Sequence, residues 1–278
     1  MKDAKTDTPP AELLERRAFL CRLTPDRALE TLDDAEAFLR DRGMLTRSPD
    51  SSLPSLFEAC HEDPYAPAAG GFGQWPRTKW GWSFALLGRP GVYSLKIHHR
   101  RKTLYVAAAV ARLIDPIVRD ELERMTAQSP DWAAVLEHLD ATGPSTSDDL
   151  KTELGLGSRE LKAILYPLEL CGVVVTQPVQ AREDGLIETF TYARWDQVFP
   201  EAAPGRASID DLLVAGVHAA VLATEREIPR WFSWRWRIDD GAVDRLVSAG
   251  RLERPARGWV AAPASASSGS ARGTGGRV

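Results

Sequence analysis

The sequence predicts an α+β, helix-rich chain built from three tandem winged-helix modules, each a helix-turn-helix followed by a β-hairpin wing. Three observations lead to this prediction. Between residues 131 and 200, helical periodicities are followed by two alternating strands. The same order recurs between residues 208 and 262, and it fits the N-terminal half with a longer insert. The copies share little sequence identity, so the prediction depends on order and periodicity.

The middle module, residues 131–200, shows the pattern most clearly. Apolar residues recur at helical spacing over 132–139, a short second helix follows, and a third helix extends from Ser158 to Leu168. Val173–Val179 and Leu186–Tyr192 alternate as strands around a turn at 182–185. The two strands and their turn are the predicted wing.

The C-terminal module repeats this order in a shorter form. It has a long apolar helix over 209–224, a second helix over 230–237, a third helix from Asp239 to Gly250, and a hairpin formed by 251–255 and 259–261. The second helix, RWFSWRWR, mixes three cations with three tryptophans. Because the following helix begins Asp239-Asp240, which would repel DNA, we expect this segment to have a structural or interdomain role.

The N-terminal module, residues 11–107, contains an inserted loop at 63–73. It is expected to contain three helices: the first begins at Asp33, the second covers Leu53–Cys60 and the third covers Pro76–Leu87. Its two wing strands are expected at 93–97 and 103–107. Residues 108–130 should form a helical connector that Pro116 kinks or splits. Residues 1–10 and the small, polar tail 263–278 are expected to be disordered.

Composition excludes several classes of protein. Three widely separated cysteines contain no CxxC pair and cannot build a disulfide framework, which indicates a reducing compartment. We find no signal peptide and no run of about 18 apolar residues, so the chain is predicted to be cytoplasmic with no membrane partner. No phosphate-binding, dinucleotide, zinc or hydrolase motif occurs, and neither a metal nor a small-molecule cofactor is expected.

One basic segment stands out in a chain whose formal net charge is −4. Trp75–Tyr105 contains seven basic residues, no acidic residue, and three tryptophans interleaved with the cations. Positive charge beside flat apolar rings suits the phosphates and bases of nucleic acid. The alternative is a solvated basic hairpin packed on a buried tryptophan cluster.

The predicted DNA contacts lie where a winged helix usually meets DNA, on the third helix and the wing. In the N-terminal module they form an open, solvent-facing cationic platform, and the third helix of the middle module adds two more cations. The predicted DNA-binding residues are Arg77, Lys79, Trp82, Arg100, Arg101, Lys102, Arg159 and Lys162. For the last two, solvated cations on an amphipathic helix are the alternative.

Three segments, Ala35–Leu39 (AEAFL), Leu53–Phe57 (LPSLF) and Gly73–Trp80 (GQWPRTKW), together with the three-module organisation, resemble the AlkZ-related winged-helix proteins. The resemblance implies tandem winged helices that hold duplex DNA in a concave surface and remove alkylated or crosslinked bases. The family's catalytic Gln-x-Gln or Gln-x-Asp motif is missing. The third position of the motif would be Pro76 after Gln74 and Val179 after Gln177, and neither is Gln or Asp. No catalytic residue can be transferred, and Gln74 remains the single candidate.

The predicted function is therefore binding of double-stranded DNA, in the setting of DNA repair, through the basic helix and wing of the N-terminal module. One alternative is a DNA glycosylase of altered motif that acts on alkylated or crosslinked bases. A second alternative is a protein-interaction scaffold, because winged helices also assemble complexes. The residues alone leave catalysis open.

Overall fold

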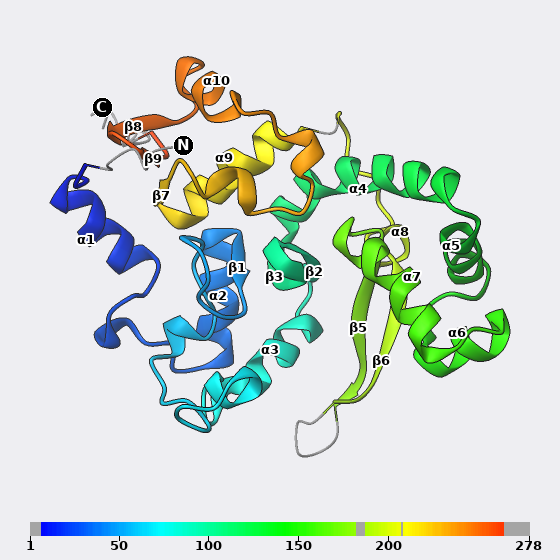
Figure 1. Cartoon of the computed structure of the whole chain (residues 1–278). Helices are drawn as coiled ribbons and strands as arrows, with labels where there is room; N and C mark the ends of the chain where they lie inside the picture. Colours follow the sequence, from blue (N-terminus) through cyan, green and yellow to red (C-terminus); the bar gives the residue numbers. More distant parts are fainter. Residues whose placement is uncertain (1–6, 182–186, 207, 264–278) are drawn as a thin grey trace, which may run out of the picture.

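The computed structural model describes residues 7–181, 187–206 and 208–263 (Figure 1). It contains ten α-helices and three small antiparallel sheets in this part of the chain, which confirms the α+β, helix-rich class. Parts of three predictions lie outside the described residues: the turn at 182–185, the first six residues of the N-terminal tail, and the C-terminal tail beyond residue 263.

The three sheets share one strand order, in which a short first strand pairs with the second strand of a later hairpin. The orders are β1-β3-β2, β4-β6-β5 and β7-β9-β8. The strands are β1 (Met44–Thr46), β2 (Val92–His98), β3 (Lys102–Ala107), β4 (Ser145–Thr146), β5 (Val174–Ala181), β6 (Ile187–Arg194), β7 (Leu222–Thr224), β8 (Glu253–Ala256) and β9 (Trp259–Ala261). The three predicted hairpins are present as β2–β3, β5–β6 and β8–β9.

Several helices begin at a residue whose side chain caps them. Thr31 and Asp34 form a capping box at the start of α2, and Thr146 and Asp149 form another at the start of α6. The α-helices are α1 (Ala11–Leu20), α2 (Leu32–Arg42), α3 (Trp82–Ala85), α4 (Ala108–Gln128), α5 (Pro130–Thr142), α6 (Ser147–Leu154), α7 (Ser158–Leu170), α8 (Trp195–Val198), α9 (Ile209–Ala220) and α10 (Ala242–Ser248). Helix α1 was not predicted.

Two predicted helices of the N-terminal module are wrong in extent. The backbone of residues 53–57 instead runs alongside β1. Thr46 N–H donates to Pro54 O at 2.9 Å, and Leu56 N–H donates to Thr46 O at 2.9 Å. Only Glu58–Cys60 forms a 3-10 turn there. Over 76–87, the Glu62 carboxylate accepts the N–H groups of Thr78 and Lys79 at 3.0 and 2.9 Å, and helical structure starts only at Lys79.

Other corrections concern the later segments. Pro116 does not split α4, which runs unbroken from Ala108 to Gln128. Helix α9 stops at Ala220, because Val221 has a left-handed φ of 67° and the chain continues as β7. Residues 230–237 do not form a continuous helix. The 3-10 turns cover Ile228–Arg230 and Arg235–Arg237, and between them Ser233 N–H donates to Ile97 O of β2 at 2.7 Å and holds the segment against that strand.

The tryptophan-rich segment is confirmed as structural. Trp231, Phe232 and Trp234 are buried, and their backbone meets β2 at an isolated bridge between His98 and Phe232. The Trp234 indole N–H donates to Cys171 O at 3.3 Å. The segment therefore packs against both the first sheet and the end of α7.

The sheet β1-β3-β2 is a wall shared by two apolar cores. Leu45 and Tyr105 face a core formed with α2, whereas Met44, Leu104 and Val106 face a core that continues through α4, α7 and α9. Alternate residues of a strand point to opposite faces, so these strands are buried on both sides. The second core links the middle and C-terminal parts of the chain into one packed body.

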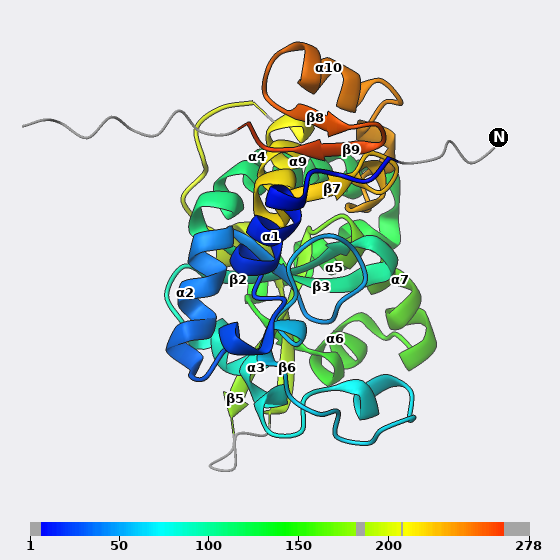
Figure 2. The same ribbon diagram turned by 90° about the vertical axis from the view of Figure 1, so that its left-hand side faces the viewer.

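The N-terminal segment lies against the C-terminal hairpin (Figure 2). Asp7 N–H donates to Arg257 O at 3.1 Å, and the Trp259 indole N–H donates to Asp7 O at 2.8 Å. Order at this end thus begins earlier than residue 10. In the described chain, no helix has both the length and the apolar character needed to cross a bilayer.

Candidate nucleic-acid interface

A cavity of about 660 Å³ lies between the N-terminal and middle parts of the chain; we call it the groove. One wall comes from Arg47, α3 and the loop before it, the floor from β2, β3 and the turn between them, and the other wall from α7, β5 and β6. Figure 1 shows α3 and the β5–β6 hairpin on either side of this region. The lining residues are Arg47, Phe72, Trp75, Phe84, Leu87, Ser94, Lys96, Arg100, Arg101, Thr103, Tyr166, Thr176, Phe190 and Tyr192.

A second cavity of about 360 Å³ adjoins the groove and is lined by apolar and aromatic side chains; we call it the aromatic recess. It shares four residues, Phe72, Trp75, Phe84 and Phe190, with the groove. The remaining lining residues are Tyr65, Pro76 and Trp80. None of the described residues that line the recess is charged, so the recess is an apolar space beside the cationic groove.

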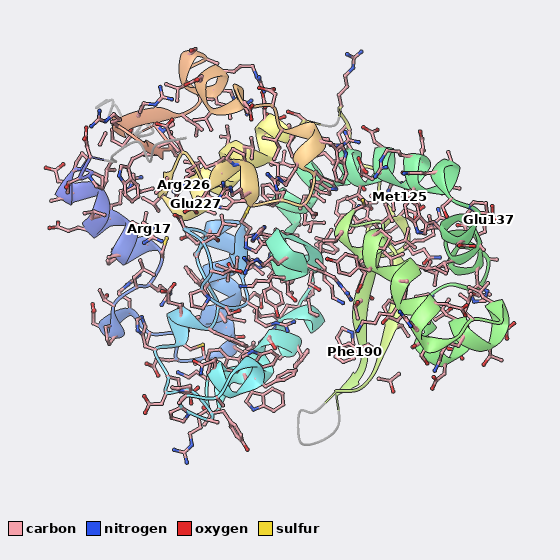
Figure 3. All side chains as sticks on the ribbon, in the orientation of Figure 1. Arg17, Met125, Glu137, Phe190, Arg226 and Glu227 are labelled. Atoms are coloured by element: carbon pink, nitrogen blue, oxygen red, sulfur yellow. The ribbon has the colours of Figure 1, made fainter. Side chains whose placement is uncertain are left out.

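Phe190 of β6 reaches across this space toward α3 (Figure 3). Its ring centroid lies 5.9 Å from that of Phe84. Phe72 and Trp75 pack 4.3 Å apart, and the Arg47 guanidinium lies 5.1 Å from the Trp75 ring and 5.7 Å from the Phe84 ring. Flat rings and a stacked guanidinium thus alternate along the wall.

The turn between β2 and β3 sets the cationic floor of the groove. Arg100 and Arg101 both have left-handed φ values, 57° and 59°, which is uncommon for residues other than glycine. The turn projects Arg100 into solvent, where it forms no ion pair with any described residue, while Arg101 turns inward.

Arg101 and Lys96 converge on one buried carboxylate. Glu169 of α7 is 1% exposed and forms ion pairs with both cations, and it accepts a hydrogen bond from the Thr176 hydroxyl at 2.8 Å. The Arg101 guanidinium also lies 5.1 Å from the Tyr166 ring. The pKa of the nearby Tyr192 hydroxyl is raised, mainly because the group is partly buried and also because the negative charge of Glu169 lies close to it.

Lys102 is paired as well, with Asp50 at 2.5 Å. The second oxygen of Asp50 lies 3.0 Å from Nε2 of the buried His98. Partial burial alone would raise the pKa of the Asp50 carboxyl, but its hydrogen bonds with His98 and Lys102 outweigh burial, and the net pKa is lowered. The β2–β3 hairpin is therefore anchored by carboxylates at both Arg101 and Lys102.

The predicted residues before β2 lie outside the groove. Lys79 Nζ donates to Leu29 O at 2.7 Å and lies 5.4 Å from the Trp82 ring, and Trp82 packs on the N-terminal core. Arg77 is exposed and has no ion-pair partner among the described residues. The expected platform is thus only partly open, because Lys79, Arg101 and Lys102 are satisfied within the protein.

Arg159 and Lys162 of α7 are exposed and unpaired in the described part of the chain. They lie at helical spacing from Tyr166, which lines the groove, so the same face of α7 leads from Arg159 to the groove wall. Gln74, the catalytic candidate, is exposed, lines neither cavity, and donates from its amide to Ala69 O in its own loop. No group of three or more possible metal ligands occurs among the described residues.

Sequence reasoning missed Arg47, Phe72, Phe190 and Thr176 as groove residues. Phe190 and Tyr192 alternate on β6, where they face Pro178 and Thr176 of β5 across the ladder. This two-residue spacing was a usable signal. Arg47 carried no such signal, because its place depends on how residues distant in sequence pack together.

Comparison with known proteins places the chain in a family. Residues 93–273 match the family described as DNA glycosylase AlkZ-like, which is more than half of the sequence, and the chain belongs to this AlkZ-like family. The family predicted from the sequence is confirmed. A solved structure, Streptomyces sahachiroi DNA glycosylase AlkZ, is similar with a TM-score of 0.47 and 15% identity, covering 86% of this chain and 66% of that one. No curated protein matches the chain.

Proposed function

We propose that this chain binds double-stranded DNA across the mouth of the groove, in the context of DNA repair. The observation that carries the proposal is a cavity lined by four cations and by aromatic rings in a member of the AlkZ-like family. Cations supply phosphate affinity and rings supply stacking surface. Glu169 offsets part of the charge beneath the floor, but Arg47 and Arg100 have no carboxylate partner among the described residues.

We also propose that the chain consists of three winged-helix modules with the boundaries expected from the sequence. The shared strand order supports this, since each short strand is followed by helical segments and then by a hairpin. Under this proposal Arg100 lies at the tip of the first wing. Arg159 and Lys162 extend the phosphate track along α7, whereas Arg77, Lys79, Trp82 and Lys102 have a smaller part.

Charge reversal at the wing tip tests the proposal. In Arg100→Glu we expect weaker duplex binding and a slope of log Kobs against log salt concentration that is smaller by about 1, because a phosphate contact and its counterion release are lost. Fluorescence anisotropy over a salt series measures both quantities.

The matched control is Arg16→Glu, which makes the same change of charge at an exposed position on α1. Its affinity and slope should stay near those of the wild type apart from a small long-range effect. Equal behaviour of the two variants would contradict the proposed interface, and absence of DNA binding in the wild type would favour the scaffold alternative.

Hydrolysis of the N-glycosidic bond is a second candidate, favoured by the description of the family as DNA glycosylase AlkZ-like. Under this candidate the wild type releases free base from alkylated duplex DNA, measured by chromatography. Because Gln74 is engaged with Ala69 O and lines neither cavity, we expect Gln74→Ala to release base at the wild-type rate. Loss of release in Gln74→Ala alone would restore Gln74 as the catalytic residue.

A further inference from the structure

Exposed aromatic side chains gather around the groove. Among the described residues seven large hydrophobic side chains are exposed, and four of them, Tyr65, Phe72, Tyr166 and Phe190, line the groove or the aromatic recess. Isolated exposed hydrophobic residues need no explanation, but a cluster of flat rings around a cavity marks a binding site. The clustered rings therefore need a ligand with an apolar face.

The dimensions of this space exclude base-paired DNA from its interior. Phe84 and Phe190 face each other across it with their ring centroids 5.9 Å apart. A duplex, whose major groove alone is about 12 Å wide, cannot pass between them. A single flat ring is small enough to stack on the rings that line the recess. A duplex can lie across the mouth, while the interior suits an unpaired base.

The division of charge fits one nucleotide. Among the described residues no charged side chain lines the recess, and the polar side-chain groups of its lining residues are the Tyr65 hydroxyl and the indole N–H groups of Trp75 and Trp80. The groove, which shares part of its wall with the recess, contributes Arg47 and Arg100. Neither cation forms an ion pair with a described residue. An uncharged base in the recess would thus have its phosphate on the cationic side.

We infer that the aromatic recess and the groove together bind an unpaired nucleotide, with the base stacked in the recess and the phosphate on the cations. The inference rests on the proposed DNA binding and adds that the nucleotide bound in the recess is unpaired. Since stacking is available to every base and the recess offers few hydrogen-bonding groups, the site should tolerate any base. The nucleotide comes either from a single strand or from a base extruded from a duplex.

The test compares three probes of equal length at one salt concentration: a single strand, a fully paired duplex, and a duplex with one unpaired 2-aminopurine. We expect the wild type to bind the single strand or the unpaired duplex about tenfold more tightly than the paired duplex, and to quench the 2-aminopurine. Tight binding of the single strand identifies a free strand as a source, and tight binding of the unpaired duplex alone identifies an extruded base.

Phe72→Ala should lose most of this preference for the unpaired probes, because the Phe72 ring is 74% exposed and provides stacking surface to the recess. Tyr166→Ala, on the opposite wall, provides a second variant. Phe19→Ala on α1 removes an aromatic ring that is 53% exposed and lies in neither cavity, and it should behave as the wild type.

Equal affinity for paired and unpaired probes, or an equal loss in Phe19→Ala, would overturn the inference while leaving duplex binding in place. Failure to bind any of the three probes would instead overturn the proposed function.

Discussion

Replacing Trp231 by alanine is expected to destabilise the folded chain by roughly 3–5 kcal/mol. Trp231 is 1% exposed, and its ring packs so closely on α9 that a Cβ built on Gly216 would lie 2.7 Å from Cζ3 of the indole. Its indole N–H donates to Glu227 at 2.8 Å, and its carbonyl accepts the His99 N–H at 3.1 Å. The substitution opens a cavity beside α9 and removes the indole hydrogen bond to Glu227.

Chemical denaturation followed by circular dichroism measures this loss. The matched variant is Trp236→Ala, which removes the same ring from a position that is 58% exposed, and we expect it to cost about 1 kcal/mol or less. Similar losses in the two variants would contradict the role of residues 231–234 as a buried seam.

Glu169→Gln is expected to have opposite effects on stability and on DNA binding. Removing the buried charge leaves Lys96 and Arg101 without their common partner, which should cost about 3 kcal/mol of stability. The two cations are 28% and 25% exposed at their side chains and line the groove, so the freed charge should increase both DNA affinity and its dependence on salt.

Denaturation and anisotropy titration of the same protein sample measure both effects. Glu137→Gln, at an exposed position on α5 (Figure 3), makes the same chemical change and should alter neither quantity. Weaker DNA binding by a folded Glu169→Gln protein would show that Lys96 and Arg101 do not face the DNA.

Much of the fold could be predicted from periodicity. The α5–α7 helices and all three hairpins were found because each has an apolar stripe or an alternating run of its own. Residues 53–57 and 230–237 were predicted as helices and are not, because Leu56 bonds to β1 and Ser233 bonds to β2 through their backbone N–H groups. Such tertiary pairing leaves no local pattern.

The site was predicted less completely for a related reason. Sequence reasoning located the basic β2–β3 turn, but Arg101 and Lys102 are paired with Glu169 and Asp50, which are distant in sequence. A count of local charge cannot detect such partners. The aromatic wall formed by Phe72, Phe84 and Phe190 also depends on three separate segments packing together.

Hydrogen exchange measured by mass spectrometry, with and without a saturating gapped duplex, tests the central claim most directly. If DNA lies at the groove, amides of the β2–β3 turn, α7 and β6 should become protected, while α1 and α10 exchange as before. Protection confined to α1 or α10, with the β2–β3 turn and β6 unchanged, would contradict the account.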